Sequence, residues 1–167
     1  MFYLFMLLGL CEVQAMKPAP PKKISYTDSG TSFRVESDPK TNITQVYAPN
    51  GEVLWILKEY IGRKIIHLSP DGQSLILIGN QYFGGLLSTN EQSKVFEVYK
   101  KGTLKTSYTF EEFFGMSIAT AIREFDIPQM GGGWFAMMRY VRLEQINWEQ
   151  SQIELHFLDE RTRKVDF

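Results

Sequence analysis

The chain has 167 residues, 44% of them hydrophobic and 22% charged, which is the composition of one globular domain with enough apolar material for a core. Its 18 basic and 19 acidic residues give a formal net charge of −1, so it lacks the excess positive charge that non-specific binding to nucleic acid or to an anionic membrane requires. Aromatic residues make up 14% of the chain, a content that favours β structure.

The chain opens with an apolar run from Phe2 to Leu10, followed by Val13-Gln14-Ala15, whose small or modest residues suit a signal peptidase. We therefore expect a signal peptide over residues 1–15, cut after Ala15, and a secreted or periplasmic protein. The run covers about half of the ~20 residues that a membrane-spanning helix needs, so no stable membrane span is expected. No Lys or Arg precedes the run, which leaves an atypical leader, a start further upstream and an apolar N-terminal strand as alternatives.

Cys11 is the single cysteine of the chain and lies inside this leader. Acylation of Cys11 would make a lipoprotein, but Leu10 is bulky where the bacterial lipobox pattern has a small residue, so we do not favour that interpretation. Cleavage after Ala15 would leave a mature domain without a thiol. Such a domain has no disulfide, no cysteine-ligated zinc and no cysteine nucleophile.

Residues 16–23 are rich in Pro and Lys and are predicted to form a semi-extended linker, because proline removes hydrogen-bond donors and favours polyproline geometry. A single β domain is expected to follow over residues 24–167. Its first hairpin is predicted from the short apolar runs 24–27 and 32–36, which flank the turn Asp28-Ser29-Gly30.

A second hairpin is predicted from the runs 43–48 and 53–58, because Asn50-Gly51 between apolar runs is the strongest short-range hairpin signal. In its second strand, Trp55 is expected to share a face with Val53 and Leu57. Leu54 and Ile56 would fill the opposite face, which predicts an internal strand.

The strongest signal in the chain runs from Arg63 to Asn80, where two apolar runs flank Ser69-Pro70-Asp71-Gly72. Proline presets φ for the first central turn position, aspartate bonds its own backbone, and glycine takes the left-handed conformation. The second arm contains four consecutive apolar residues, 75–78, and is therefore predicted to be a central strand with core on both faces.

The remaining chain continues the pattern of short strands, with one helix. Thr109 and Glu112 have the spacing of a capping box, which predicts a short helix over 110–114 that ends at Gly115. Leu104, Thr106, Tyr108 and Phe110 alternate with Lys105 and Ser107, so one face of that strand is expected to be wet. Strands are predicted at 94–100, 103–110, 134–143, 152–158 and 163–167, loops at 81–90 and 128–133, and helix or strand at 118–125.

These elements predict an all-β fold with one short helix. Antiparallel hairpins and a meander would form a twisted sheet, a small sandwich or a partial, propeller-like arrangement. The segment Leu68-Ser-Pro-Asp-Gly-Gln-Ser-Leu-Ile-Leu77 resembles the strand-turn-strand of TolB-type propeller repeats. The run from Val98 to Glu112 is similar to one that follows such a hairpin in uncharacterised secreted bacterial proteins.

A second sign of repetition supports this resemblance. Val46-Tyr47 before Gly51 and Val98-Tyr99 before Gly102 place similar units about fifty residues apart, a period that fits one four-stranded propeller blade. The chain has about three blade lengths where closure needs four, so a complete propeller is not expected. A sheet completed by another chain is one of the predicted outcomes.

No catalytic, metal-binding or cofactor-binding constellation is predicted. His67 is expected to be a core histidine bonded to a backbone partner, and His156 a solvated residue beside Glu154. Ser69 is interpreted as part of the turn rather than as a nucleophile. The neighbouring pairs Glu111-Glu112 and Asp159-Glu160 are interpreted as solvated carboxylates rather than an acid-base dyad.

The candidate binding residues are aromatic. Tyr82 and Phe83 precede a glycine pair, and Trp134 and Phe135 follow a glycine triplet, so these rings could form a ligand or partner surface. The leading hypothesis is a secreted or periplasmic, non-enzymatic β domain that serves as a structural module or binds a protein, possible self-association included. The alternative is a small-molecule or glycan-binding module that uses these rings. A third hypothesis is a hydrolase with carboxylates converging from separate strands.

Overall fold

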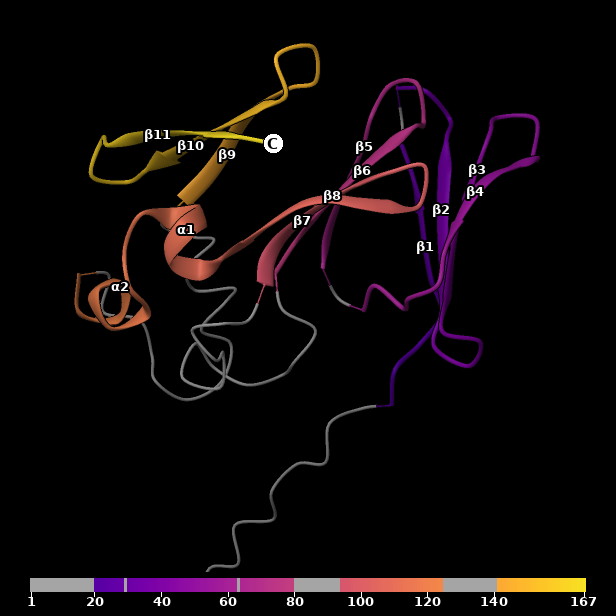
Figure 1. Cartoon of the computed structure of the whole chain (residues 1–167), viewed down its shortest axis with the longest axis horizontal. Helices are drawn as coiled ribbons and strands as arrows, with labels where there is room; N and C mark the ends of the chain where they lie inside the picture. Colours follow the sequence, from indigo (N-terminus) through magenta and orange to yellow (C-terminus); the bar gives the residue numbers. More distant parts are fainter. Residues whose placement is uncertain (1–19, 29, 63, 80–93, 125–140) are drawn as a thin grey trace, which may run out of the picture.

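The computed structural model describes residues 20–28, 30–62, 64–79, 94–124 and 141–167, with 141–144 described as backbone only. In these residues three antiparallel sheets and two short helices confirm the predicted all-β class (Figure 1). The elements are β1 (Ile24–Thr27), β2 (Arg34–Asp38), β3 (Ile43–Tyr47), β4 (Val53–Leu57), β5 (Ile65–Leu68), β6 (Ser74–Ile78), β7 (Lys94–Lys100), β8 (Thr103–Thr109), α1 (Phe110–Phe114), α2 (Ile118–Glu124), β9 (Val141–Asn147), β10 (Gln152–Phe157) and β11 (Thr162–Asp166).

Strands that are consecutive in the chain are neighbours in all three sheets. The first sheet has the order β1-β2-β3-β4, the second β5-β6-β7-β8, and the third, of three strands, β11-β10-β9. Every pairing is antiparallel, so each of the first two sheets is a four-stranded meander built from the predicted hairpins. Of the segment 118–125, which the sequence left between helix and strand, residues Ile118–Glu124 form the helix α2.

The second sheet lies between two hydrophobic cores, and β6 is the strand that serves both. Leu75 and Leu77 belong to the core shared with the first sheet, whereas Ile76 and Ile78 belong to the core shared with the helices and the third sheet. All four side chains are fully buried, which confirms the predicted central strand. A strand with core on both faces reads as a continuous apolar run rather than as an alternation.

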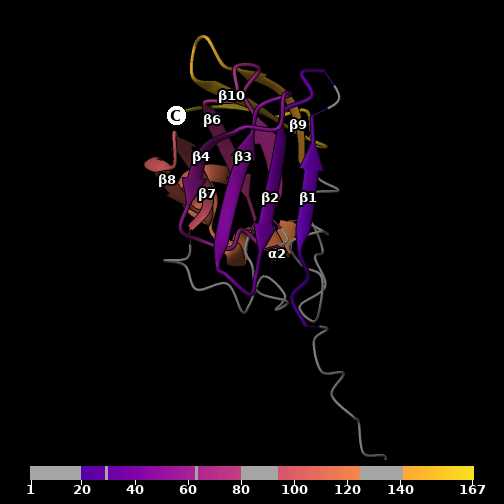
Figure 2. The same ribbon diagram turned by 90° about the vertical axis from the view of Figure 1, so that its right-hand side faces the viewer.

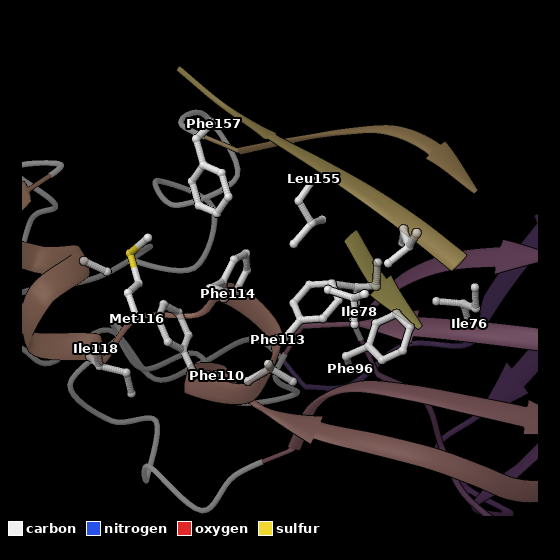
Figure 3. Packing of buried hydrophobic residues seen from close by; sticks show 14 of the residues in the cluster. Ile76, Ile78, Phe96, Phe110, Phe113, Phe114, Met116, Ile118, Leu155 and Phe157 are labelled. Carbon is white, nitrogen blue, oxygen red and sulfur yellow. The ribbon is translucent and has the colours of Figure 1, made fainter. Parts of the chain in front are cut away.

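The core on the far side of the second sheet is rich in phenylalanine. Phe96 of β7 stacks on Phe113 of α1 with ring centroids 4.6 Å apart, and Phe114 meets Phe113 edge-on at 4.9 Å. Figure 3 shows these rings between β6, β7 and the third sheet, with Leu155 and Phe157 of β10 closing the core from above. The third sheet is thereby fixed to the second through α1.

Helix α1 has the predicted capping box. The Glu112 N–H donates to Thr109 Oγ1 at 3.3 Å, and the Thr109 N–H donates to Glu112 Oε2 at 2.7 Å, a bond that lowers the pKa of the Glu112 carboxyl. Gly115 ends the helix at φ 74°. Arg163 of β11 donates to the carbonyls of Phe113 and Glu112 at 3.0 and 2.8 Å, so a cation satisfies the last turn of the helix.

The prediction that β4 is an internal strand, with Val53 on the face of Trp55 and Leu57, is wrong. Trp55 and Leu57 are buried, but Val53, Leu54 and Ile56 are 46%, 37% and 48% exposed. The strand lies at the edge of its sheet, and a register shift opposite Val46 and Tyr47 pairs Val53 with Tyr47. That shift removes Val53 from the buried face of Trp55, because an extra residue in one strand changes the alternation.

The alternation predicted for β8 is also interrupted. The register shifts between Val98 and Tyr99, so that Tyr99 pairs with Leu104 and Val98 with Thr106, leaving Lys105 as the extra residue. Leu104, predicted to share a face with Phe110, is 47% exposed. A bulge in an edge strand redirects the side chains on either side of it.

Candidate functional site

The four predicted surface residues, Tyr82, Phe83, Trp134 and Phe135, lie outside the described residues. The predicted loops at 81–90 and 128–133, and most of the strand predicted at 134–143, lie outside them as well.

Ser69 belongs to its turn, as predicted. Its Oγ donates a 2.6 Å hydrogen bond to Asp71 Oδ1 and accepts one of 2.8 Å from the Ser74 N–H. The Gly72 N–H donates to the Ser69 carbonyl at 2.9 Å. The bond from Ser69, followed by one from the Gln73 N–H, lowers the pKa of the Asp71 carboxyl. Asp71 therefore acts as an ionised acceptor that holds the turn, not as the orienting member of a catalytic triad.

The two histidines lie on different sheets. His156 Nε2 is 2.7 Å from Glu154 Oε1, and the His156 side chain is 38% exposed, which agrees with the predicted polar face of β10. The buried Nε2 of His67 has no hydrogen-bond partner among the described residues, so the expected bond to a backbone partner is not made through this nitrogen. Burial lowers the pKa of His67.

The predicted carboxylate pairs are used locally. Glu112 caps α1, and Asp159 Oδ2 accepts from Arg161 at 2.6 Å in an ion pair that lowers the pKa of Asp159. Within the described ranges, no three His, Cys, Asp or Glu side chains gather in a way that could hold a metal ion. Nor does any helix there have the length and apolarity to cross a membrane.

A buried ionic cluster, which we call the Lys64 cluster, was not predicted. It consists of Glu59, Lys64, Glu97 and Tyr99, where the Lys64 ammonium bonds Glu97 and lies 3.7 Å from Glu59 Oε1. The Tyr99 hydroxyl lies 3.1 Å from Glu59 and 3.3 Å from Glu97. Burial, and then the two carboxylates, raise the pKa of Tyr99, so its hydroxyl is a neutral donor rather than a base.

The Lys64 cluster joins the first two sheets. Glu59 follows the last strand of the first sheet, whereas Glu97 and Tyr99 belong to the second. The Lys64 side chain is only 6% exposed and that of Glu97 is 13% exposed. Each buried charge would be costly without the opposite charge beside it. Sequence spacing could not reveal this cluster, because its members come from separate segments. We assign it to the packing of the sheets.

A groove of about 390 Å³ is the first candidate binding site. On one side it is bounded by the β5–β6 turn and by the ends of β7 and β8. On the other side it is bounded by the β9–β10 turn and Phe167. The β5–β6 and β9–β10 turns point to the same end of the molecule in Figure 1. Trp148 forms an aromatic wall, edge-on to Phe167 at 5.9 Å. The groove is lined by Ser69, Pro70, Asp71, Ser74, Val98, Lys100, Lys105, Trp148, Glu149, Ser151 and Phe167. Sequence reasoning missed it; the one local signal was a tryptophan beside an acid in a turn.

The second candidate is the outer face of the first sheet, which Figure 2 shows from the front with β1 to β4 side by side. The strand pairing places the side chains of this outer face on the side of the sheet that is turned away from the buried Val35, Val46 and Trp55. The outer face is defined by Arg34, Glu36, Gln45, Tyr47, Val53 and Ile56.

The polar side chains of this outer face bind one another. Arg34 lies over the Tyr47 ring at 4.5 Å and pairs with Glu36 at 3.3 Å, and the Tyr47 hydroxyl donates to Gln45 at 2.9 Å. Val53 and Ile56 lie beside this network, and none of the six residues belongs to either core of the described part.

Comparison with protein-family models, with curated proteins and with solved structures finds no match to this chain.

Proposed function

We propose that this chain is a non-enzymatic β domain, secreted or periplasmic as its leader suggests, that acts as an interaction module by pairing with a second copy of itself. The pairing surface is the outer face of the first sheet. The observation that carries the proposal is the exposure of Val53 and Ile56, at 46% and 48%, next to Tyr47 on the outer face. Adjacent exposed apolar side chains on a sheet favour association, because burying each one gains free energy.

The charges at the two ends of β4 support a second copy as the partner. Glu52 precedes the strand and Lys58 follows it, and both are exposed. A two-fold axis across the strand reverses its direction, so each Glu52 would meet Lys58 of the other copy. Such an interface is self-complementary, as two-fold symmetry requires.

Contact between faces is favoured over pairing along the strand edge. A Cβ added to Gly102 would lie 2.4 Å from the carbonyl oxygen of Ile56, so the β7–β8 turn lies directly against β4. Another strand could not add along the whole length of β4 while that turn is in place. On the outer face, by contrast, Val53 and Ile56 are exposed within the described part of the chain.

The stacking of the two meanders is consistent with this mode of association. The first sheet already packs on the second through Val46, Trp55 and Leu75. A partner sheet on its outer face would add a further layer, as expected for a propeller-like arrangement completed by another chain.

The test is the mass of the purified protein in solution, measured by sedimentation velocity over a range of concentrations. Ile56→Lys is expected to shift the protein to monomer, because a buried apolar side chain contributes about 1.5–3 kcal/mol and a dimer loses two. The dissociation constant should therefore rise by roughly 100-fold or more.

Leu158→Lys is the matched control. Leu158 is 57% exposed and lies in the turn between β10 and β11, away from the outer face, so this variant should dimerise like the natural chain. A natural chain that stays monomeric at every concentration would refute the proposal. Equal effects of the two substitutions would do the same, because they would show association without a specific face.

A further inference from the structure

The groove beside Trp148 has the features of a built site, and it lies apart from the outer face of the first sheet. Its lining combines three serines and four charged residues with four apolar or aromatic residues, which are Pro70, Val98, Trp148 and Phe167. Its volume of about 390 Å³ falls within the range of small-molecule sites.

Irregular backbone brings these side chains together. The bulge opposite Val98 leaves Lys105 as the extra residue of β8, and Lys105 lines the groove together with Lys100 across the hairpin. Ser151 has φ 51°, a left-handed conformation that non-glycine residues seldom adopt, in the turn that presents Trp148 and Glu149. Bulges are frequent next to binding sites because they redirect side chains.

The charges in the groove cancel. Asp71 and Glu149 are acidic, Lys100 and Lys105 are basic, and among the described residues neither lysine nor Glu149 forms an ion pair. A site with no net charge has little attraction for an ion. Charged groups of both signs do form strong hydrogen bonds with hydroxyl groups, which can donate and accept.

We infer that this groove binds a neutral saccharide. A sugar ring has one apolar face of C–H groups, which suits the indole of Trp148, and a rim of hydroxyls that suits Glu149, Lys105 and Lys100. This inference is independent of the proposed pairing of two chains, because the two surfaces share no residue. It places a glycan-binding site at residues other than the aromatic ones predicted from sequence.

The test is isothermal titration of the purified protein with short cello-, malto-, xylo- and chito-oligosaccharides. At least one of these neutral probes should bind, and Glu149→Gln and Lys105→Met should each weaken binding about tenfold, the usual effect of losing a charge-assisted hydrogen bond. Both side chains are exposed, so neither change threatens the fold. Lys40→Met, in the β2–β3 turn, is the control that should leave affinity unchanged.

Two further readouts fix the site and the ligand class. Binding should shift tryptophan fluorescence in the natural chain but not in Trp148→Phe, and affinity should be insensitive to salt. Absence of binding by every neutral probe up to about 10 mM would overturn the inference. So would equal affinity in the Glu149 and Lys105 variants, or binding confined to acidic saccharides and lost at high salt.

Discussion

At the scale of single residues, His67 combines two properties that make the fold sensitive to acid. Its Nε2 is buried without a hydrogen-bond partner among the described residues, and burial lowers its pKa below the ordinary value of 6.5. The folded protein thus keeps His67 neutral at pH values where the unfolded chain already binds a proton. The contribution of His67 to stability therefore falls as the pH drops below about 6.5, since the unfolded state then holds more protons at this residue.

Chemical denaturation between pH 7.5 and 5.5 tests this consequence. His156→Gln provides a background in which His67 is the only histidine, because the chain has two. In that background stability should decline as pH falls from about 6.5, and adding His67→Phe should remove the decline. An unchanged decline in the double variant would show that other groups cause it.

At the scale of elements, the turns set how closely the sheets approach. Gly102 has φ 77°, and a Cβ there would lie 2.4 Å from the Ile56 carbonyl oxygen. Gly51, in the β3–β4 turn, has a similar φ of 88° but nothing within 4 Å of an added Cβ. Both glycines therefore permit a left-handed turn, but only Gly102 also permits close packing.

Substitution by alanine separates these two effects. Gly51→Ala should cost about 1 kcal/mol of unfolding free energy, the price of a left-handed alanine. Gly102→Ala should cost about 1–3 kcal/mol more, because the β7–β8 turn must move away from β4. Urea unfolding measures both, and equal losses would mean that the contact with Ile56 does not constrain the packing of the sheets.

At the scale of the whole molecule, two meanders stack on each other, and the outer face of the first sheet exposes some apolar side chains. Val46 and Trp55 bury the inner face of that sheet, and the Lys64 cluster joins it to the second. Pairing of two copies through the outer face gives Val53 and Ile56 the neighbours that they lack within the described chain. The central claim is that this face is an interface.

Local rules explain what could be predicted from sequence. The Ser69 turn, the capping box of Thr109 and the doubly buried β6 each depend on neighbouring residues, and each is found as expected. The failures concern non-local packing. The apolar pattern of β4 could not show that its sheet ends there, and no spacing relates Trp148 to Lys105 before the sheets pack.

One cross-linking measurement tests the central claim most directly. Within one chain, Glu52 and Lys58 lie six residues apart at opposite ends of β4, a separation of roughly 20 Å that a zero-length carbodiimide cross-link cannot span. An equal mixture of ¹⁴N and ¹⁵N protein should therefore give cross-linked peptides in which Glu52 of one isotope is joined to Lys58 of the other. Mixed-isotope pairs at these residues are the predicted result. Their absence, with cross-links confined to single chains or mapped to other faces, would contradict the account.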